Sequence, residues 1–204
     1  MKTKVVASFP WILVVFHVVG LVLFLTDPKA AQLSYLNILL CGTLVFLSEK
    51  SLLKSFPALV VIFTLGFIVE LAGTKTGLLF GDYQYGAVLG KSVYGVPLII
   101  GVNWFAIVAA SSALAARFNL SLLFKAIMAG LLAVLLDFLI EPVAIHYGFW
   151  SWKNNKIPFY NYLSWFVFAA AFSYFYLKSA SGKNTTAFWL YFIWALFFAV
   201  LNLI

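Results

Sequence analysis

The sequence predicts an all-α integral membrane protein in which residues 1–204 form one domain, a bundle of about seven transmembrane helices. Hydrophobic residues make up 65% of the chain and charged residues only 9%, whereas roughly a quarter of the residues in soluble proteins are charged. The apolar residues gather into seven runs, each close to the ~20 residues that a spanning helix needs. A Gly-rich stretch between the third and fourth runs predicts a re-entrant or capping loop there.

Breaks in the apolar pattern define the spans in order. The first, residues 8–26, follows a basic start as a signal peptide would, but it is long for one and its A-x-A cleavage pattern is weak. Only Arg117, Phe118 and Asn119 separate the fourth span from the fifth, which predicts a tight hairpin before a helix start at Ser121. The remaining spans are expected at residues 32–48, 57–73, 97–116, 121–140, 160–178 and 187–203.

The basic residues predict the orientation, because cytoplasmic loops hold an excess of Lys and Arg. With the N-terminus inside, eight of the 13 basic residues fall on the inner side. The two longest connections, residues 74–96 and 141–159, both follow odd-numbered spans and therefore share the outer side. We expect an integral protein of the cytoplasmic (inner) membrane of a prokaryote, with its functional site near these two connections.

Several classes of site are disfavoured by the composition. The net charge of +7 comes from basic residues scattered among the connections, whereas nucleic-acid binding requires them to cluster. The single cysteine, Cys41, builds neither a disulfide nor a cysteine metal site within one chain. The two histidines are far apart, so His17 is expected to be a hydrogen-bonded interhelical residue rather than a metal ligand.

The acidic residues are the main candidates for chemistry, since a carboxyl inside a membrane is costly unless it is paired, protonated or facing a cavity. Asp27 and Glu49 lie at span ends beside Pro28 and Lys50, where we expect them to be solvated surface residues. The other four acids fall near the outer ends of the third and fifth spans or in the connection after the third: Glu70, Asp82, Asp137 and Glu141.

The pair Asp137 and Glu141 is spaced by four residues, which puts both carboxyls on one face of a helix. Two like charges this close cannot both form cheaply, so one carboxyl is expected to keep its proton near neutral pH and to serve as a proton donor. A structural alternative is that each carboxyl binds a nearby donor, such as His146 or Lys75, and holds the fold together.

Polar and aromatic side chains lie near these acids. The glycine-spaced residues 74–96 carry Tyr83 and Tyr85, and could instead form a flexible outer loop. Asn103, in the fourth span, could orient a water molecule or bind a neighbouring helix. A further set of aromatic residues resembles an interfacial belt, and we interpret most of them as anchors in the membrane. They are Trp150, Trp152, Tyr160, Tyr162 and Trp165.

These residues form a series of spaced motifs over about residues 66–166. They are Glu70-x-x-Gly73-x-x-Thr76-Gly77-x-x-Phe80-Gly81-x-Tyr83-x-Tyr85, Gly95-Val96-Pro97, Trp104, Asp137-x-x-x-Glu141-Pro142, Gly148-x-Trp150-x-Trp152 and Ile157-Pro158-x-x-Asn161-x-x-x-Trp165. The series resembles the membrane carotenoid hydratase family, whose members add water to the terminal double bond of acyclic carotenoid ends. The chain departs from that family in having Ser164 where a glycine is usual, and in a short hydrophilic piece at residues 153–156.

The resemblance implies a lyase that hydrates a lycopene- or γ-carotene-type end group by protonation to a tertiary carbocation and capture of water. It implies Asp137 or Glu141 as the proton donor, with the other carboxyl and Glu70 positioning the water. Substrate- and water-positioning roles are implied for Asp82, Tyr83, Tyr85, Asn103, Trp104, Trp150, Trp152 and Asn161. No cofactor or metal is expected. The expected partners are a lipophilic carotenoid, water, the lipid bilayer and other membrane enzymes of the carotenoid pathway.

Other functions stay open at this stage. Carotenoid cyclases and isomerases also act on polyenes, and cyclases work by protonating them. A small proton-coupled transporter would also use membrane acids, although transporters commonly show paired repeats, and here the polar residues gather at one end. A retinal-binding receptor is disfavoured because the last span contains no Lys for a Schiff base.

Overall fold

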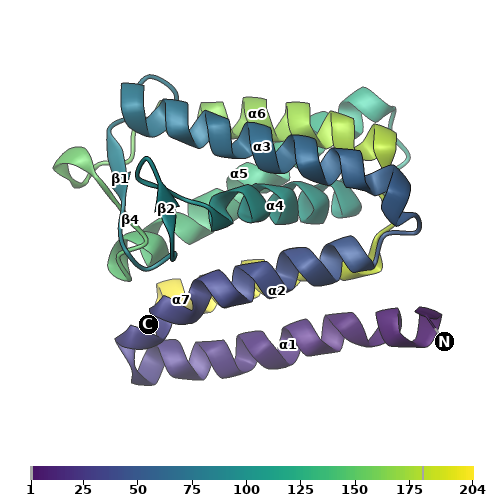
Figure 1. Cartoon of the computed structure of the whole chain (residues 1–204), viewed down its shortest axis with the longest axis horizontal. Coiled ribbons are helices and arrows are strands. Elements are labelled where there is room, and N and C mark those ends of the chain that lie inside the picture. Colours follow the sequence, from purple (N-terminus) through teal and green to yellow (C-terminus); the bar gives the residue numbers. More distant parts are fainter. Residues whose placement is uncertain (1, 181) are drawn as a thin grey trace.

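The computed structural model describes residues 2–180 and 182–204, and in that part of the chain seven α-helices pack side by side (Figure 1). The view places α3 and α6 along one side of the bundle, α1 along the other, and α4 between them. The predicted all-α bundle is confirmed. The helices are α1 (Lys2–Thr26), α2 (Ser34–Leu47), α3 (Leu52–Thr76), α4 (Ile99–Ala115), α5 (Leu122–His146), α6 (Phe159–Ser179) and α7 (Thr185–Leu203).

The helices have the apolar character of membrane spans. Five segments of the described chain are long and apolar enough to cross a membrane, and α4 is an apolar helix of 17 residues. α4 lies at the centre, since every residue from Trp104 to Ala113 is buried. Its many Ala and Ser residues let the neighbouring helices approach closely. α6 is less apolar because it carries Asn, Ser and Tyr side chains.

The end of α5 differs from the prediction, since the helix continues to His146 rather than ending at residue 140. Proline removes one helical hydrogen bond but need not end a membrane helix when neighbouring groups stabilise the freed backbone. Here Pro142 lies inside α5 and leaves the carbonyl of Phe138 without its helical N–H donor, while Asn202 of α7 donates a side-chain hydrogen bond to the adjacent carbonyl, that of Leu139, at 2.7 Å. The added turn carries Glu141 on the helix.

The two long connections meet at one end of the bundle, as predicted from their shared side (Figure 1). Gly77, with φ +66°, ends α3 and begins the capping loop, which we define as residues 77–98. Strand β1 (Tyr83–Tyr85) of this loop pairs antiparallel with β4 (Trp150–Trp152), which follows α5. A smaller hairpin joins β2 (Ser92–Val93) to β3 (Val96–Pro97). The Gly-rich segment thus takes the capping form.

Further contacts fasten the capping loop to the helices. The Ser164 hydroxyl of α6 donates to the carbonyl of Leu79, so the residue that departs from the family motif forms a tether. The Tyr160 hydroxyl donates to the Gly77 carbonyl at 3.2 Å. Together with β1 and β4, these bonds fix the loop over the ends of α3, α5 and α6.

The opposite end of the bundle holds a correction to the sequence interpretation. Glu49 is buried rather than solvated, with only 5% of its surface exposed. It accepts hydrogen bonds from the Tyr176 hydroxyl, from Asn184 Nδ2 at 2.7 Å and from Ser55 Oγ at 3.3 Å. The interpretation failed because three donors, two of them distant in sequence, replace water around the carboxyl. Asp27 is exposed as expected and accepts from the Lys29 backbone N–H at 2.9 Å.

Close packing of α3 against α4 places the first residues of the candidate site. A Cβ atom at Gly66 would lie 2.6 Å from Trp104 Cγ, so only glycine permits this approach. The Trp104 indole in turn stacks on Trp165 of α6, with ring centroids 4.1 Å apart and an interplanar angle of 13°. The three helices therefore hold a rigid aromatic wall beneath the capping loop.

Candidate active site

Glu70 is the most heavily hydrogen-bonded of the carboxyls under the capping loop. It projects from α3, is 4% exposed, and accepts from the indole N–H of Trp104 at 3.0 Å through Oε1. Its Oε2 accepts from the Tyr85 hydroxyl at 2.7 Å and from the Tyr83 hydroxyl. Three donors around one buried carboxyl suit an ionised group, because charged acceptors form the stronger hydrogen bonds.

Glu141 is held from the other strand of the ribbon. Its Oε2 accepts from Trp150 Nε1 at 3.0 Å and from Trp152 Nε1 at 2.8 Å. Successive side chains of a strand point to opposite faces, so the pairs Tyr83/Tyr85 and Trp150/Trp152 each present both members to the bundle. The β1–β4 ribbon thus aims four donors at two carboxyls.

Asp137 has the fewest donors of the three carboxyls. It lies one turn before Glu141 on α5 and is 1% exposed. Asn161 Nδ2 of α6 donates to its Oδ2 at 3.0 Å, and this is its one hydrogen bond within the described part of the chain. The second oxygen, Oδ1, is therefore left to carry a proton or to meet a ligand.

A cavity of about 30 Å³ lies between the three carboxyls. This space suffices for one or two water molecules, since a water needs roughly 10–15 Å³ by this measure. All the residues predicted for the site line it except Trp104 and Asp82; the lining includes Glu70, Tyr83, Tyr85, Asn103, Asp137, Glu141, Trp150, Trp152 and Asn161. Trp104 lies behind Glu70 as its hydrogen-bond donor.

Asp82 requires a correction, because its side chain lies outside this cavity. Strand alternation sends residues 82 and 84 away from the bundle when Tyr83 and Tyr85 point into it. Asp82 instead forms an exposed ion pair with Lys153 at 2.8 Å, and the Lys153 backbone N–H donates to its carbonyl at 2.9 Å. The hydrogen bond and charge of Asp82 raise the pKa of the Lys153 ammonium. Asp82 therefore links the two connections from outside.

The interpretation of the aromatic residues as a membrane belt is wrong for three of them. Trp150 and Trp152 bind Glu141, and Trp165 lies 8% exposed against Trp104. Phe80, Ile100 and Trp165 also line the small cavity but were not predicted as site residues. A signal for Trp165 was its spacing one helical turn after Asn161, which puts both on one face of α6.

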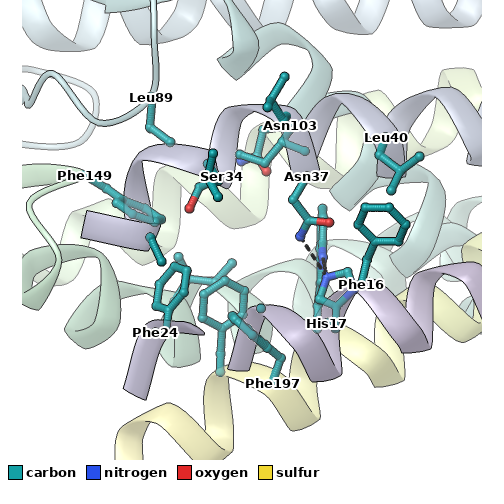
Figure 2. Close-up of a pocket in the computed structure, with 18 of the residues that line it drawn as sticks. Phe16, His17, Phe24, Ser34, Asn37, Leu40, Leu89, Asn103, Phe149 and Phe197 are labelled. Atoms are coloured by element: carbon teal, nitrogen blue, oxygen red, sulfur yellow. Dashed lines mark hydrogen bonds between the residues drawn. The ribbon is translucent and has the colours of Figure 1, made fainter. Parts of the chain in front are cut away.

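A second, larger cavity has a volume of about 380 Å³, and Figure 2 shows the side chains that line it. It is lined mainly by apolar side chains of α1, α2, α4, α5 and α7, with Leu89 of the capping loop. Both cavities share Ile100, Asn103 and Trp150 as lining residues. A water-sized acidic cavity and an apolar cavity of ligand size therefore meet at these three side chains.

His17 lies in the wall of the larger cavity, and the prediction of an interhelical, hydrogen-bonded histidine is confirmed. Its Nε2 accepts from Trp194 Nε1 of α7 at 3.0 Å and lies 3.2 Å from Asn37 Nδ2 of α2. Its Nδ1 is 2.7 Å from the Leu13 carbonyl. Within the described residues, no group of three His, Cys, Asp or Glu side chains is arranged to hold a metal ion.

A Tyr83→Phe variant tests the hydrogen bond to Glu70 through its pH dependence. Burial, and then the charge of Glu70, raise the pKa of the Tyr83 phenol above its ordinary value of 10.0. The unfolded chain loses this proton near pH 10 while the folded protein keeps it, so stability from the phenol is complete below pH 10 and falls above it. We expect the variant to be about 1.5–3 kcal/mol less stable below pH 10, with a smaller difference at higher pH. Thermal unfolding in detergent measures this; a difference that grows with pH would contradict it.

Comparison with known proteins gives a family match over most of the chain. The family described as carotenoid biosynthesis protein matches residues 30–204. The chain is also 29% identical over 122 residues to the bisanhydrobacterioruberin hydratase of Haloarcula japonica. The matched region covers 54% of this chain and 40% of that protein. The chain thus spans about two fifths of the length of this curated relative. No solved structure matches.

Proposed function

This chain belongs to the carotenoid biosynthesis protein family, and we propose that it is a hydratase that adds water across the terminal C=C bond of an acyclic carotenoid end group. The observation that carries this proposal is the water-sized cavity enclosed by Glu70, Asp137 and Glu141 beside a larger apolar cavity. Hydration needs these components together: a proton donor, a water molecule and a site for the hydrocarbon. The substrate class we propose is a lycopene- or γ-carotene-type end.

Asp137 is the proton donor in this proposal, rather than Glu141. Three carboxyls enclosing one small cavity cannot all be ionised cheaply, since each buried charge needs donors or a counter-charge. Glu70 has three donors and Glu141 has two, whereas Asp137 has one. The carboxyl with the fewest donors gains most from keeping its proton, and its free Oδ1 can deliver that proton to carbon.

The reaction balances without a further reactant. The proton of Asp137 adds to the less substituted carbon of the terminal double bond and leaves a tertiary cation on its neighbour. Water from the small cavity forms the new C–O bond, and its released proton passes to a carboxylate, Glu141 or Asp137. Desolvated aromatic faces such as Trp150 and Trp165 stabilise a cation by about 2 kcal/mol. The proposal needs no cofactor.

The location of the enzyme follows from the same reasoning. A carotenoid dissolves in the hydrocarbon layer, and the apolar helices suit that layer. We propose that the protein lies in the inner membrane of a prokaryote with its N-terminus inside, because the side away from the capping loop has the excess of Lys and Arg. The donating and receiving partners are then other membrane enzymes of the carotenoid pathway.

Isotope incorporation tests the reaction directly. The protein in lipid nanodiscs is given lycopene in deuterium oxide enriched in heavy oxygen, and the pigment is analysed by mass spectrometry. We expect a gain of one water per reacted end, with one deuterium fixed on carbon and the oxygen derived from the solvent. An unchanged mass with an altered absorption spectrum would contradict hydration and favour the alternative, a cyclase or isomerase. Proton uptake into proteoliposomes without any pigment change would favour a transporter.

A further inference from the structure

We propose that the 380 Å³ cavity binds one end of an acyclic isoprenoid chain, which enters from the lipid layer between α1 and α2 and meets the acidic cavity at Asn103 and Trp150. This assignment of the substrate site rests on the proposed hydratase function. It adds the place where the hydrocarbon binds and the route by which it arrives. Neither is given by the three carboxyls themselves.

The walls of this cavity suit a hydrocarbon, because three of its polar side chains, those of His17, Asn37 and Trp194, bind each other. The Trp194 indole N–H donates to His17 Nε2, and the Asn37 amide lies 3.2 Å from the same nitrogen (Figure 2). Most of the remaining lining is aliphatic or phenyl, including Phe24 and Phe197, whose ring centroids are 5.7 Å apart. Cavities lined in this way stay dry and accept apolar ligands.

The opening of the cavity faces the lipid side of the bundle. Phe16 and Val19 of α1 are each 53% exposed, and Leu36 of α2 is 48% exposed, yet all three line the cavity. Apolar side chains at the outer surface of a membrane bundle contact lipid. A chain dissolved in the bilayer can therefore slide in between α1 and α2 without crossing the capping loop or entering water.

The inner limit of the cavity is where the chemistry would occur. Asn103 of α4 lines both cavities, and its amide forms no side-chain hydrogen bond with the described residues. Trp150 also lines both, while its indole N–H donates to Glu141. An alkene at this junction would lie between an apolar pocket and the carboxyls, with the Asn103 amide free to hold the attacking water.

The size of the cavity fits an end group rather than a whole carotenoid. Ligand pockets span roughly 300–1,000 Å³, and 380 Å³ lies at the lower limit of that range. The rest of a long chain would remain among the lipids beside α1 and α2. The structure therefore suits an enzyme that holds one end of its substrate at a time.

A Gly20→Leu variant tests this site by filling it. Gly20 of α1 lines the cavity, and a Cβ atom there would meet only Phe197 Cε2 at 3.8 Å, an ordinary contact, so the larger side chain extends into the empty space. The matched control is Val18→Phe, which adds as many carbon atoms at a position of α1 that is 57% exposed and outside the cavity. Both changes are made in an Asp137→Asn background for binding and in the wild-type background for turnover.

The probe is lycopene in nanodiscs, measured by visible circular dichroism. Lycopene is achiral, so it gives a signal in a protein site but none when dissolved in lipid. We expect Gly20→Leu to weaken binding about tenfold or more, which corresponds to ~1.4 kcal/mol, and to reduce hydration in parallel, while Val18→Phe retains both.

The outcomes separate this proposal from the proposed function. Undiminished circular dichroism and hydration in Gly20→Leu would overturn the cavity assignment and leave the hydratase proposal intact. In another outcome the wild-type protein forms no hydrated product, yet lycopene gives a circular dichroism signal that Gly20→Leu removes. This result would support the cavity assignment and overturn the hydratase proposal. Equal losses in Gly20→Leu and Val18→Phe would overturn the cavity assignment, since the control does not touch it.

Discussion

An Asp137→Asn variant should hydrate lycopene roughly 10²–10⁴ times more slowly than the wild type, the range that a general acid contributes. The amide keeps the size of the side chain, and its oxygen can still accept from Asn161 Nδ2, which donates to Asp137 Oδ2 at 3.0 Å. The variant is therefore expected to fold, with a melting temperature close to that of the wild type. The variant loses the acidic proton, because the amide that replaces the carboxyl of Asp137 cannot donate one to carbon. Turnover in nanodiscs, followed by chromatography of the pigments, measures the effect.

The matched control is Asp82→Asn, which removes a carboxyl of the same kind from the outside of the capping loop. Asp82 is exposed and pairs with Lys153, and exposed ion pairs contribute little, so its turnover should stay within about twofold of the wild type. A Glu141→Gln variant completes the set. If Glu141→Gln lost the greater part of the rate while Asp137→Asn kept most of it, Glu141 would be the proton donor.

Much of this site could be anticipated from local sequence patterns. The spacing of Asp137 and Glu141 by four residues predicts one helical face, and both line the same cavity. The strands at Tyr83–Tyr85 and Trp150–Trp152 were not predicted, although the spacing of these aromatic residues by two is typical of strands and the two segments pair in register. The two long connections were predicted to share one side of the membrane because each follows an odd-numbered span. The prediction for Asp137 and Glu141 succeeded because the helical period fixes which side chains share a face.

Other features depend on tertiary contacts that the sequence pattern does not show. Glu49 looked solvated because it stands beside Lys50, yet Tyr176 and Asn184, which bind it, come from more than a hundred residues further along the chain. Asp82 was expected in the site because it lies in the connection after the third span. Its side chain points outward because of the strand that follows it, which was not predicted. The larger cavity depends on gaps between five helices, so its position is set by packing rather than by any single motif.

The two buried carboxyl clusters, at opposite ends of the bundle, make a matched pair for a second test. Glu70 accepts from Tyr83, Tyr85 and Trp104, and Glu49 likewise accepts from three donors. Truncating Glu70 to Ala leaves three buried donors without an acceptor, each costing roughly 1–3 kcal/mol. We therefore expect Glu70→Ala to lose about 3 kcal/mol of stability or more, together with the attachment of the capping loop.

Glu70→Gln separates this structural effect from the charge. Its amide oxygen can accept from Trp104 while its N–H groups donate to the tyrosine hydroxyl oxygens, so the loop should stay attached and most of the stability should remain. The rate of hydration should nevertheless fall at least tenfold, because a neutral amide no longer stabilises the positive charge of the carbocation as a carboxylate does. Thermal unfolding and turnover, measured on both variants, distinguish the two contributions.

Tryptic cleavage after Lys91, an exposed residue of the capping loop, shows where the bundle opens. Glu70→Ala should speed this cleavage, whereas Glu49→Ala, destabilised to a similar extent at the far end, should not speed it under native conditions. The comparison is informative because both variants lose a buried acceptor and only one of the two acceptors touches the loop. Equal acceleration in the two would mean that cleavage follows global unfolding, and that Glu70 does not hold the capping loop.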